Sequence, residues 1–355
     1  MISSDKGSTY FPPEWHPQSA IQLTWPTASS DWKPYLEEAE ACFLTIAKEI
    51  IKDQLLILVV PEAKKVKALF SAEEWKNIIA VEAKYEDTWA RDHGGISAYR
   101  NGLPKVLDFK FNAWGGKFEC VLDNEITQKL FDRGVFDLPV ERESHDGFVL
   151  EGGSIESNGN GVLLTTEHCL LNQNRNEMWS KEQIEDQLKL RLGVQKVLWI
   201  RNGGITGDDT DSHVDTLARF IGQNMIAYVR CLDSEHPDYA GLKQMEEELL
   251  EFEDQNGSPF ELFPLPMPDE ILDQDTGERL PATYANFLIM NQKVLLPIYG
   301  VDQDQLAFEA LERCFPSKKI VPINCEVLIR QHGSLHCITM QYPEGFVLSS
   351  SKKDI

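Results

Sequence analysis

Apolar residues recur at spacings of three and four between residues 36 and 50, and glutamates fill the opposite side of the pattern. This periodicity predicts an amphipathic helix. The run that follows, residues 54–60, is apolar after its first residue and predicts a buried strand. The apolar positions of the helix are Leu36, Ala39, Phe43, Ile46 and Ile50.

Helix-like and strand-like segments alternate along the rest of the chain, which predicts an α/β fold. Ser180 and Gln183 form a potential capping box at the start of a helix from Lys181. Two strand-like runs are expected near the C-terminus. The other expected strands are 105–111, 147–156, 161–166 and 196–200, with an apolar run at 218–229 and a hairpin at 285–299; the other expected helices are 123–131, 241–255 and 304–315.

Glycine pairs mark several of the expected strand ends and hint at repeated units, but their spacing is uneven and periodicity alone does not select a topology. No Gly- or Ser-rich linker divides the chain, and the Pro-rich stretch 253–270 is interleaved with apolar residues. We therefore expect one continuous domain over residues 1–355, with residues 1–10 and 350–355 frayed. The pairs lie at 94–95, 115–116, 152–153 and 203–204.

The composition restricts the partners. The chain has 57 acidic and 34 basic residues, a formal charge of -23, so phosphate backbones would be repelled and nucleic acid is not an expected partner. The start lacks the basic and apolar regions of a signal peptide, and no apolar run is long enough to span a membrane. Seven scattered cysteines without a CxxC pair predict reduced thiols. A cytoplasmic protein is expected.

Four segments place charged residues beside glycines, tryptophans or apolar runs, where folding alone would not require them. Each also has a purely structural interpretation, which has to be weighed first. The segments are DTWARDHGG (87–95), VLEGGSIE (149–156), GDDTDSHVD (207–215) and HGSLHC (332–337).

The segment 207–215 carries alternating polar residues, and an extended backbone would direct all of them to one side. A solvated loop with Asx turns is the structural alternative. A calcium loop fails, because Val214 and Phe220 stand where such a loop needs glycine and glutamate. No zinc, Walker or dinucleotide-binding motif occurs, so neither a metal nor a cofactor is expected. The alternating residues are Asp209, Asp211, His213 and Asp215.

Cys337 could be an inert buried residue, as most free cysteines are. As a nucleophile it would need a proton acceptor brought close by the fold, and His213 is the candidate. His336 is a poorer candidate, because neighbouring residues in a strand point to opposite faces.

Asp92 could merely pair with Arg91, and Glu151 could be a surface carboxylate at a turn. Trp89 lies three residues before Asp92, however, and a tryptophan beside a carboxylate would form an apolar wall for a flat cation. Core packing is the alternative explanation for that tryptophan.

Taken together, these segments resemble the agmatine deiminase and bacterial peptidyl-arginine deiminase family of the guanidine-modifying superfamily. The resemblance covers nearly the whole chain. In place of the family's triple glycine before the cysteine, this chain has QHGSLHC, in which Gly333, His336 and Cys337 keep their places. The matching segments are FPPEWHPQSAIQLTWP, DTWARDHGG, FNAWGGKF, LEGGSIE, LLTTEHCLLNQNRN, GDDTDSHVDTLARF and HGSLHCITMQ.

The resemblance implies a five-bladed α/β propeller of ββαβ-type units with the active site along its central axis. It implies that Asp92 and Asp215 hold a guanidinium group, that Cys337 attacks its carbon, and that His213 and Glu151 transfer protons and activate water. A covalent amidino-thioether would be the intermediate. The implied partner is a small cationic guanidino substrate, with no membrane or nucleic acid, and the family resemblance also allows a homo-oligomer.

Agmatine is the substrate that the resemblance favours. Asp209 matches a position that contacts the distal amine in agmatine deiminases, whereas Trp114 takes the place of an arginine that holds a carboxylate in peptidyl-arginine enzymes. A peptidyl- or free-arginine deiminase with the same catalytic residues, an amidinotransferase, and a non-catalytic propeller that acts as a binding module are the alternatives. Release of ammonia would distinguish an enzyme from the last of these.

Overall fold

The computed structural model describes residues 9–347. They form two compact units: unit 1 holds residues 16–152 and 337–347, and unit 2 holds Thr9–Trp15 and Gly153–His336. Most of the two ends expected to be frayed lies outside the described residues. That expectation is wrong for Thr9–Tyr10, which form the short strand β1. The single-domain expectation stays a prediction.

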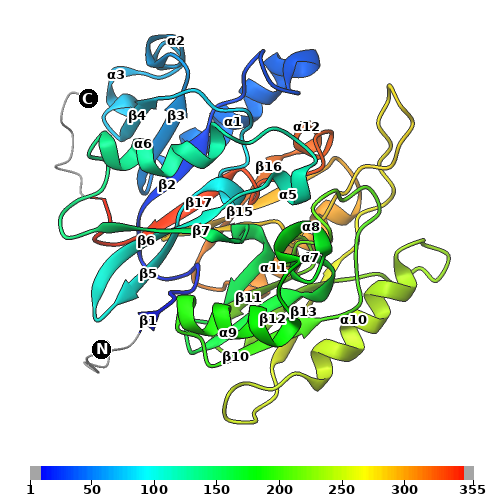
Figure 1. Ribbon diagram of the computed structural model, residues 1–355. Coiled ribbons are helices and arrows are strands. Elements are labelled where there is room, and N and C mark those ends of the chain that lie inside the picture. Colours follow the sequence, from blue (N-terminus) through cyan, green and yellow to red (C-terminus); the bar gives the residue numbers. More distant parts are fainter. Residues whose placement is uncertain (1–8, 348–355) are drawn as a thin grey trace. The chain divides into compact units, whose positions relative to one another are not determined.

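Unit 1 contains strands of two mixed sheets (Figure 1). In one of them the last strand, β17, pairs antiparallel with β2, which continues in parallel to β3 and β4. In the other, β5 and β6 are antiparallel, and β6 and β7 are parallel. The strands are β2 (Gln18–Thr24), β3 (Leu55–Val60), β4 (Ile78–Glu82), β5 (Ile96–Arg100), β6 (Leu103–Lys110), β7 (Glu141–Val149) and β17 (Thr339–Pro343); the helices are α1 (Leu36–Ile50), α2 (Ala63–Lys67), α3 (Ala72–Trp75), α4 (Ala90–His93), α5 (Ala113–Gly116) and α6 (Ile126–Asp132), with 3-10 turns η1 (Lys33–Tyr35) and η2 (Asp123–Glu125).

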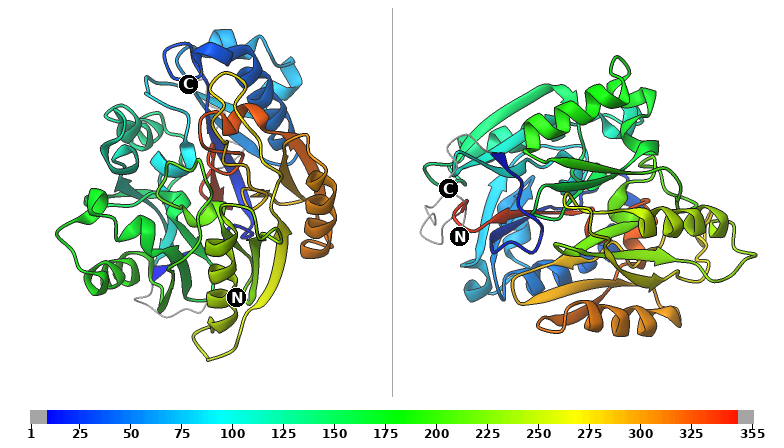
Figure 2. Two further views of the ribbon diagram at one scale, coloured as in Figure 1. Left: turned by 90° about the vertical axis from the view of Figure 1, so that its right-hand side faces the viewer. Right: turned by 90° about the horizontal axis from the view of Figure 1, so that it is seen from below.

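Unit 2 contains three sheets of three strands each, and α11 packs against β13 and β16 (Figure 2). The strands are β8 (Ile155–Ser157), β9 (Val162–Thr166), β10 (Lys196–Ile200), β11 (Ala218–Gly222), β12 (Met225–Arg230), β13 (Glu261–Pro266), β14 (Leu288–Ile289), β15 (Lys293–Ile298) and β16 (Lys319–Asn324); the helices are α7 (Glu167–Leu170), α8 (Gln173–Asn176), α9 (Lys181–Leu192), α10 (Tyr239–Glu251), α11 (Gln303–Cys314) and α12 (Glu326–Ile329), with 3-10 turns η3 (Gly152–Ser154) and η4 (Val214–Thr216).

One pattern recurs in all five small sheets of the described chain. An antiparallel strand pair is followed by one or more helices, and the chain then returns as a strand parallel to the second of the pair. In the sheet of β2 the first strand of the pattern is β17, which comes from the far end of the chain. The fold is therefore mixed α/β, built of five ββαβ-type units.

The elements form where the periodicity predicted them. The apolar positions of the first helix are buried in α1 except for Leu36, which is half-buried, and β3 is buried along its whole length. The capping box of Ser180 and Gln183 is present at the start of α9, where the side chain of each residue accepts a hydrogen bond from the backbone N–H of the other.

Two boundaries differ from the prediction. The run 147–156 is not one strand, because β7 ends at Val149 and the chain turns through η3 before β8. The helix expected to reach residue 255 ends at Glu251. Phe252 is extended there, and Asp254 instead accepts hydrogen bonds from the backbone of Asn256 and Ser258 in a turn.

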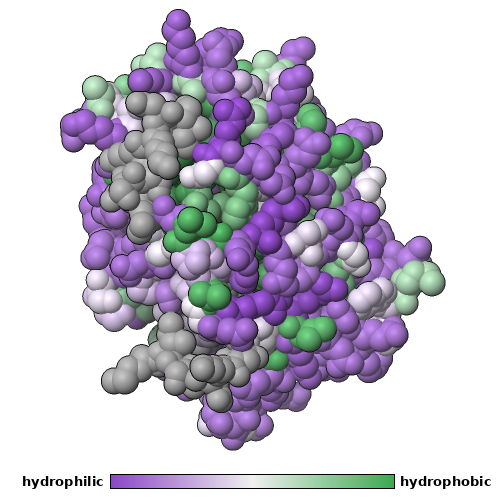
Figure 3. All heavy atoms as spheres, turned by 60° about the vertical axis from the view of Figure 1, so that its left-hand side comes forward, coloured by the Kyte–Doolittle hydropathy of each residue, from purple (hydrophilic) through white to green (hydrophobic). Residues whose placement is uncertain are grey.

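The face of the molecule drawn in Figure 3 is mostly hydrophilic, with small apolar patches between charged side chains. Such a surface agrees with the many charged residues in the sequence. Between residues 9 and 347, no helix combines the length and the apolar character needed to cross a membrane.

Asp123 is an acid buried in unit 1, with 1% of its surface exposed. Its Oδ1 accepts hydrogen bonds from the backbone N–H groups of Glu86, at 2.8 Å, and Asp87, at 3.2 Å. Burial nevertheless raises its pKa to about 7, because loss of water disfavours the charged form more than these bonds favour it.

The variant Asp123→Asn is expected to change the pH dependence of stability. Because the folded-state pKa lies above the usual value, the stabilisation belongs to the protonated acid and is lost as the pH rises through about 7. This group should lower the wild-type free energy of unfolding by about 1.4 kcal/mol between pH 6 and 8. Denaturant unfolding at both pH values measures the difference. The expectation would be contradicted if the free energy of unfolding changed equally between the two pH values in the wild type, Asp123→Asn and the exposed control Asp132→Asn.

Candidate functional site

Four of the predicted site residues occupy equivalent positions in the repeated units. Each lies two to four residues before the first strand of a unit: Asp92 before β5, Glu151 before β8, Asp215 before β11 and Cys337 before β17. The unit that begins with β14 has Asn286 at the corresponding place. The fold thus presents one polar or nucleophilic side chain from the same turn of every repeat.

Asp92 lies in the short helix α4 of unit 1 and is 4% exposed. The indole N–H of Trp114 donates a hydrogen bond to Asp92 Oδ2 at 3.0 Å. Trp89 precedes the helix, and its ring lies edge to face with that of Trp114, with centroids 6.4 Å apart. Three of the predicted residues are therefore brought together as a buried carboxylate beside two aromatic rings.

Trp114 is held in an uncommon backbone conformation. Ala113 and Trp114 have φ values of 51° and 53°, in the left-handed region that non-glycine residues seldom adopt. The side chain of Asn112 caps this turn by accepting a hydrogen bond from the N–H of Gly115 at 2.9 Å. Backbone strain of this kind concentrates at functional sites, where the surroundings hold a side chain in a required place.

Glu151 and Cys337 both pack close to α4 within unit 1. The carbonyl of Cys337 accepts a hydrogen bond from the N–H of Arg91 at 3.1 Å. A Cβ at Gly152 would lie only 2.2 Å from the carbonyl oxygen of Arg91, so the chain after Glu151 needs glycine to approach the helix. Glu151 is 0% exposed and Cys337 is 3% exposed, which rules out the surface interpretation of Glu151.

A cavity of about 520 Å³ lies in unit 1. Phe118 forms part of its wall, and the ring of Phe118 contacts that of Trp114 with centroids 5.8 Å apart. One lysine, Lys84, lines it, so the surrounding charge favours a cation. The carboxylates in its lining are Asp31, Glu86, Asp87 and Glu119.

The loop before η4 in unit 2 is curled, not extended. Asp211 and Ser212 have φ values of 65° and 62°, so the polar side chains do not alternate along a strand as the sequence suggested. Asp211 binds the guanidinium of Arg175 and has a structural role. Asp209 is half-buried in this loop, four residues before His213.

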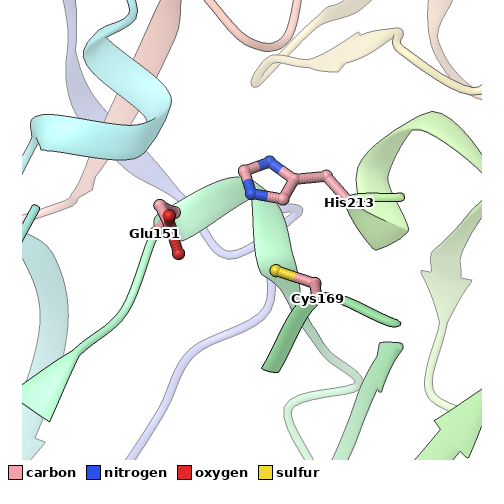
Figure 4. Close-up of side chains that lie close together, drawn as sticks. All are labelled: Glu151, Cys169 and His213. Carbon is pink, nitrogen blue, oxygen red and sulfur yellow. The ribbon is translucent and has the colours of Figure 1, made fainter. Parts of the chain in front are cut away.

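His213 is completely buried at the start of η4, and its carbonyl accepts a hydrogen bond from the hydroxyl of Thr216 at 2.8 Å. Its ring faces the thiol of Cys169 from α7, which is also 0% exposed (Figure 4). A ring nitrogen and the sulfur lie within 4.8 Å of each other. The weakly polar thiol of Cys169 thus covers one side of the imidazole.

Asp215, also in unit 2, is 0% exposed and belongs to a buried polar cluster. His336 Nδ1 lies 2.7 Å from Asp215 Oδ2. Burial alone would raise the pKa of Asp215, but the hydrogen bond and charge of His336 outweigh it and the pKa is lowered. Asp215 is therefore kept as a carboxylate at neutral pH.

The other side of the His336 ring faces two further residues. Nε2 lies 2.7 Å from Glu14 Oε2 and 3.0 Å from Arg219 Nη2. Glu14, Glu156 and His336 have the spacing of metal ligands, but the guanidinium of Arg219 binds both carboxylates and occupies the place of a cation among them. These residues fit an internal ion-pair cluster and not a metal ion.

Glu14 and Arg219 were not among the site residues predicted from the sequence. A signal was present, because Arg219 stands inside the apolar run LARFIG and Glu14 between Pro13 and Trp15. Charged residues at such positions are seldom buried without partners. The strand assumed around His336 was wrong, since residues 335–338 form a turn.

The family model of Porphyromonas-type peptidyl-arginine deiminases matches residues 10–343. The chain belongs to this family. An agmatine deiminase of Stutzerimonas stutzeri is 33% identical over 360 residues, which cover 95% of this chain and 96% of the relative.

Solved structures of the family agree with this assignment. A substrate-bound cysteine-to-serine variant of agmatine deiminase from C. jejuni is 40% identical, with a TM-score of 0.88 over 95% of this chain and 97% of that chain. A proposed arginine deiminase from Porphyromonas gingivalis is 47% identical, with a TM-score of 0.92 over 96% of this chain and 100% of that chain.

Proposed function

We propose that this protein is an agmatine deiminase, which hydrolyses agmatine to N-carbamoylputrescine and ammonia. The observation that carries the proposal is the likeness to the substrate-bound C. jejuni enzyme, at 40% identity over nearly the full length of both chains.

The five ββαβ-type units are the blades of a propeller in this proposal. Two observations support it: the same strand pattern occurs five times, and β17 from the end of the chain completes the sheet begun by β2. A ring of blades would bring the turns before the first strands to one axis. Asp92, Glu151, Asp215 and Cys337, which all lie in such turns, would then share one site with His213.

The residue types suit the chemistry of a guanidinium group. Its planar N–H donors pair with carboxylates, and Asp92 and Asp215 are the two that hold it. The faces of Trp89 and Trp114 provide apolar walls for the flat cation. The carbon is stabilised by resonance, so a positioned thiolate is a better nucleophile than water.

In the first half of the reaction, the sulfur of Cys337 forms a bond to the guanidinium carbon. The bond from that carbon to a terminal nitrogen then breaks, and His213 delivers the proton with which this nitrogen leaves as ammonia. In the second half, Glu151 and His213 remove a proton from water, which adds to the carbon of the amidino-thioether. The C–S bond breaks, the thiol is restored, and the new oxygen remains in the product as a urea carbonyl.

Asp209 is proposed to contact the distal amine of agmatine. Replacing its carboxylate in Asp209→Asn removes a charge pair with the substrate ammonium and should raise KM for agmatine about tenfold, with kcat nearly unchanged. Initial rates of ammonia release over a range of agmatine concentrations measure both constants. The matched control is Asp211→Asn, which alters the same loop at a residue paired with Arg175 and should chiefly lower stability. Equal KM values for Asp209→Asn and wild type would remove Asp209 from the substrate pocket.

A free- or peptidyl-arginine deiminase is the second candidate, favoured by the name of the Porphyromonas gingivalis structure. Parallel assays with agmatine, arginine and an arginyl peptide decide between them. We expect chelator-resistant release of ammonia from agmatine, together with a mass increment on Cys337 in acid-quenched protein. Faster turnover of arginine or the peptide would identify that compound as the substrate. No ammonia from any of the three would favour a binding module.

A further inference from the structure

The imidazole of His336 is clamped between two buried carboxylates of unit 2. Nδ1 lies 2.7 Å from Asp215 Oδ2, and Nε2 lies 2.7 Å from Glu14 Oε2. The backbone is fixed as well, because the N–H of His336 donates to Asn286 Oδ1 at 2.9 Å. His336 is 1% exposed, so water cannot substitute for these partners.

The distances identify the partners of this ring. The carboxylate oxygen of Asp215 accepts hydrogen bonds, so Nδ1 is the donor to it, whereas Nε2 lies between a carboxylate of Glu14 and the guanidinium of Arg219. Separations of 2.7 Å are typical of charge-assisted N–H···O bonds. The charged groups that face the ring are Asp215, Glu14 and Arg219, and Glu156 lies beyond Arg219.

The rest of the cluster holds Glu14 in place. Ile289 donates its N–H to Glu14 Oε1 at 2.6 Å, and Arg219 binds Glu14 Oε2. Arg219 is itself fixed by hydrogen bonds to the carbonyls of Ala285, at 3.1 Å, and Phe287, at 2.7 Å. The imidazole ring therefore has one rigid anchor, Glu14, and one side chain that it can orient, Asp215.

We propose that His336 is a positioning residue, whose imidazole ring donates from Nδ1 to Asp215 Oδ2 and so sets the plane in which the Asp215 carboxylate meets the substrate's guanidinium group. The proposal rests on the proposed function, in which Asp215 binds that group. His336 also directly precedes Cys337 in the turn at residues 335–338, so the same anchored turn carries the nucleophile.

Two substitutions separate the two ends of the ring. In His336→Asn the amide nitrogen can replace Nδ1 and donate to Asp215, whereas in His336→Gln it can replace Nε2 and donate to Glu14. We expect His336→Gln to lower kcat/KM for agmatine about 10- to 100-fold, mainly through KM, because a charge-assisted hydrogen bond to Asp215 is lost. His336→Asn should retain more of the activity. The matched control is His332→Gln in the same loop, which should keep wild-type constants.

A second measurement does not depend on turnover. Chloroacetamidine carries a planar amidinium and alkylates thiols, and iodoacetamide is its neutral counterpart. The ratio of their alkylation rates at Cys337, followed by intact mass, reports recognition of the cation. The wild type should favour chloroacetamidine, and His336→Gln should lose most of this preference at an unchanged iodoacetamide rate. If His336→Gln does not fold, Glu14→Gln provides the test, because the ring loses its anchor and part of the preference should be lost; an unchanged preference in Glu14→Gln would overturn the positioning role.

The outcomes distinguish the two proposals. A wild-type preference that persists in His336→Gln would overturn the positioning role and leave the proposed function intact. Equal losses in His336→Asn and His336→Gln would reduce His336 to a structural residue and would also overturn it. No preference in the wild type, together with no ammonia from agmatine, would instead refute the proposed function.

Discussion

Cys337→Ala should abolish the release of ammonia from agmatine, with a loss in kcat of at least about 10⁴-fold, while the protein stays folded. Removal of the sulfur eliminates the covalent intermediate, and water cannot replace a positioned thiolate as the nucleophile. The side chain is small and 3% exposed, so its replacement leaves a cavity of one sulfur atom. Ammonia release and thermal unfolding of the purified variant measure the two effects.

The matched control for this prediction is another buried thiol. Cys314 is the last residue of α11. Burial raises the pKa of its thiol to about 12, so the thiol remains protonated at neutral pH. Cys314→Ala should keep wild-type turnover with a similar small loss of stability. Turnover by Cys337→Ala within tenfold of wild type would refute the thiol mechanism, and inactivity of both variants would point to a general effect of losing a buried cysteine.

Local patterns predicted the elements of this fold well, because a helix or strand is largely selected by the spacing of its own apolar residues. The amphipathic run that begins at Leu36 became α1, and Ser180 starts α9 as predicted. The assembly of the sheets was not predictable in this way. The strand β17 pairs with β2 more than 300 residues earlier in the chain, and nothing in either strand specifies that partner.

The candidate site shows the same limit at the level of side chains. Asp92 and Trp114 share a hydrogen bond across 22 positions of sequence, and only the resemblance to a known family placed both in one site. Asp211 looked equivalent to Asp215 in the sequence, yet the left-handed backbone at Asp211 turns it towards Arg175. Side-chain direction in a loop depends on dihedral angles that residue spacing does not encode.

Arg219→Met should destabilise the folded protein by about 3–5 kcal/mol, because it leaves Glu14 and Glu156 buried without their cation. Arg219 is 0% exposed, and its guanidinium also binds two backbone carbonyls and covers the ring of Phe287, with 4.7 Å between the guanidinium carbon and the ring centroid. Methionine fills much of the volume but replaces none of these donors. Denaturant unfolding at pH 7 measures the loss.

The pH dependence of Arg219→Met provides an independent check on the cause. Burial already raises the pKa of Glu156 in the intact cluster, and removal of the guanidinium should raise it further. The destabilisation should therefore shrink as the pH falls from 8 to 5, because the isolated acids become protonated. The control is Arg201→Met. The side chain of Arg201 is 62% exposed and pairs with Glu248, so its loss should lower the free energy of unfolding by at most about 1 kcal/mol. A loss in Arg219→Met as small as that of the control would mean that the cluster does not stabilise the fold, and the anchor proposed for His336 would lose its basis.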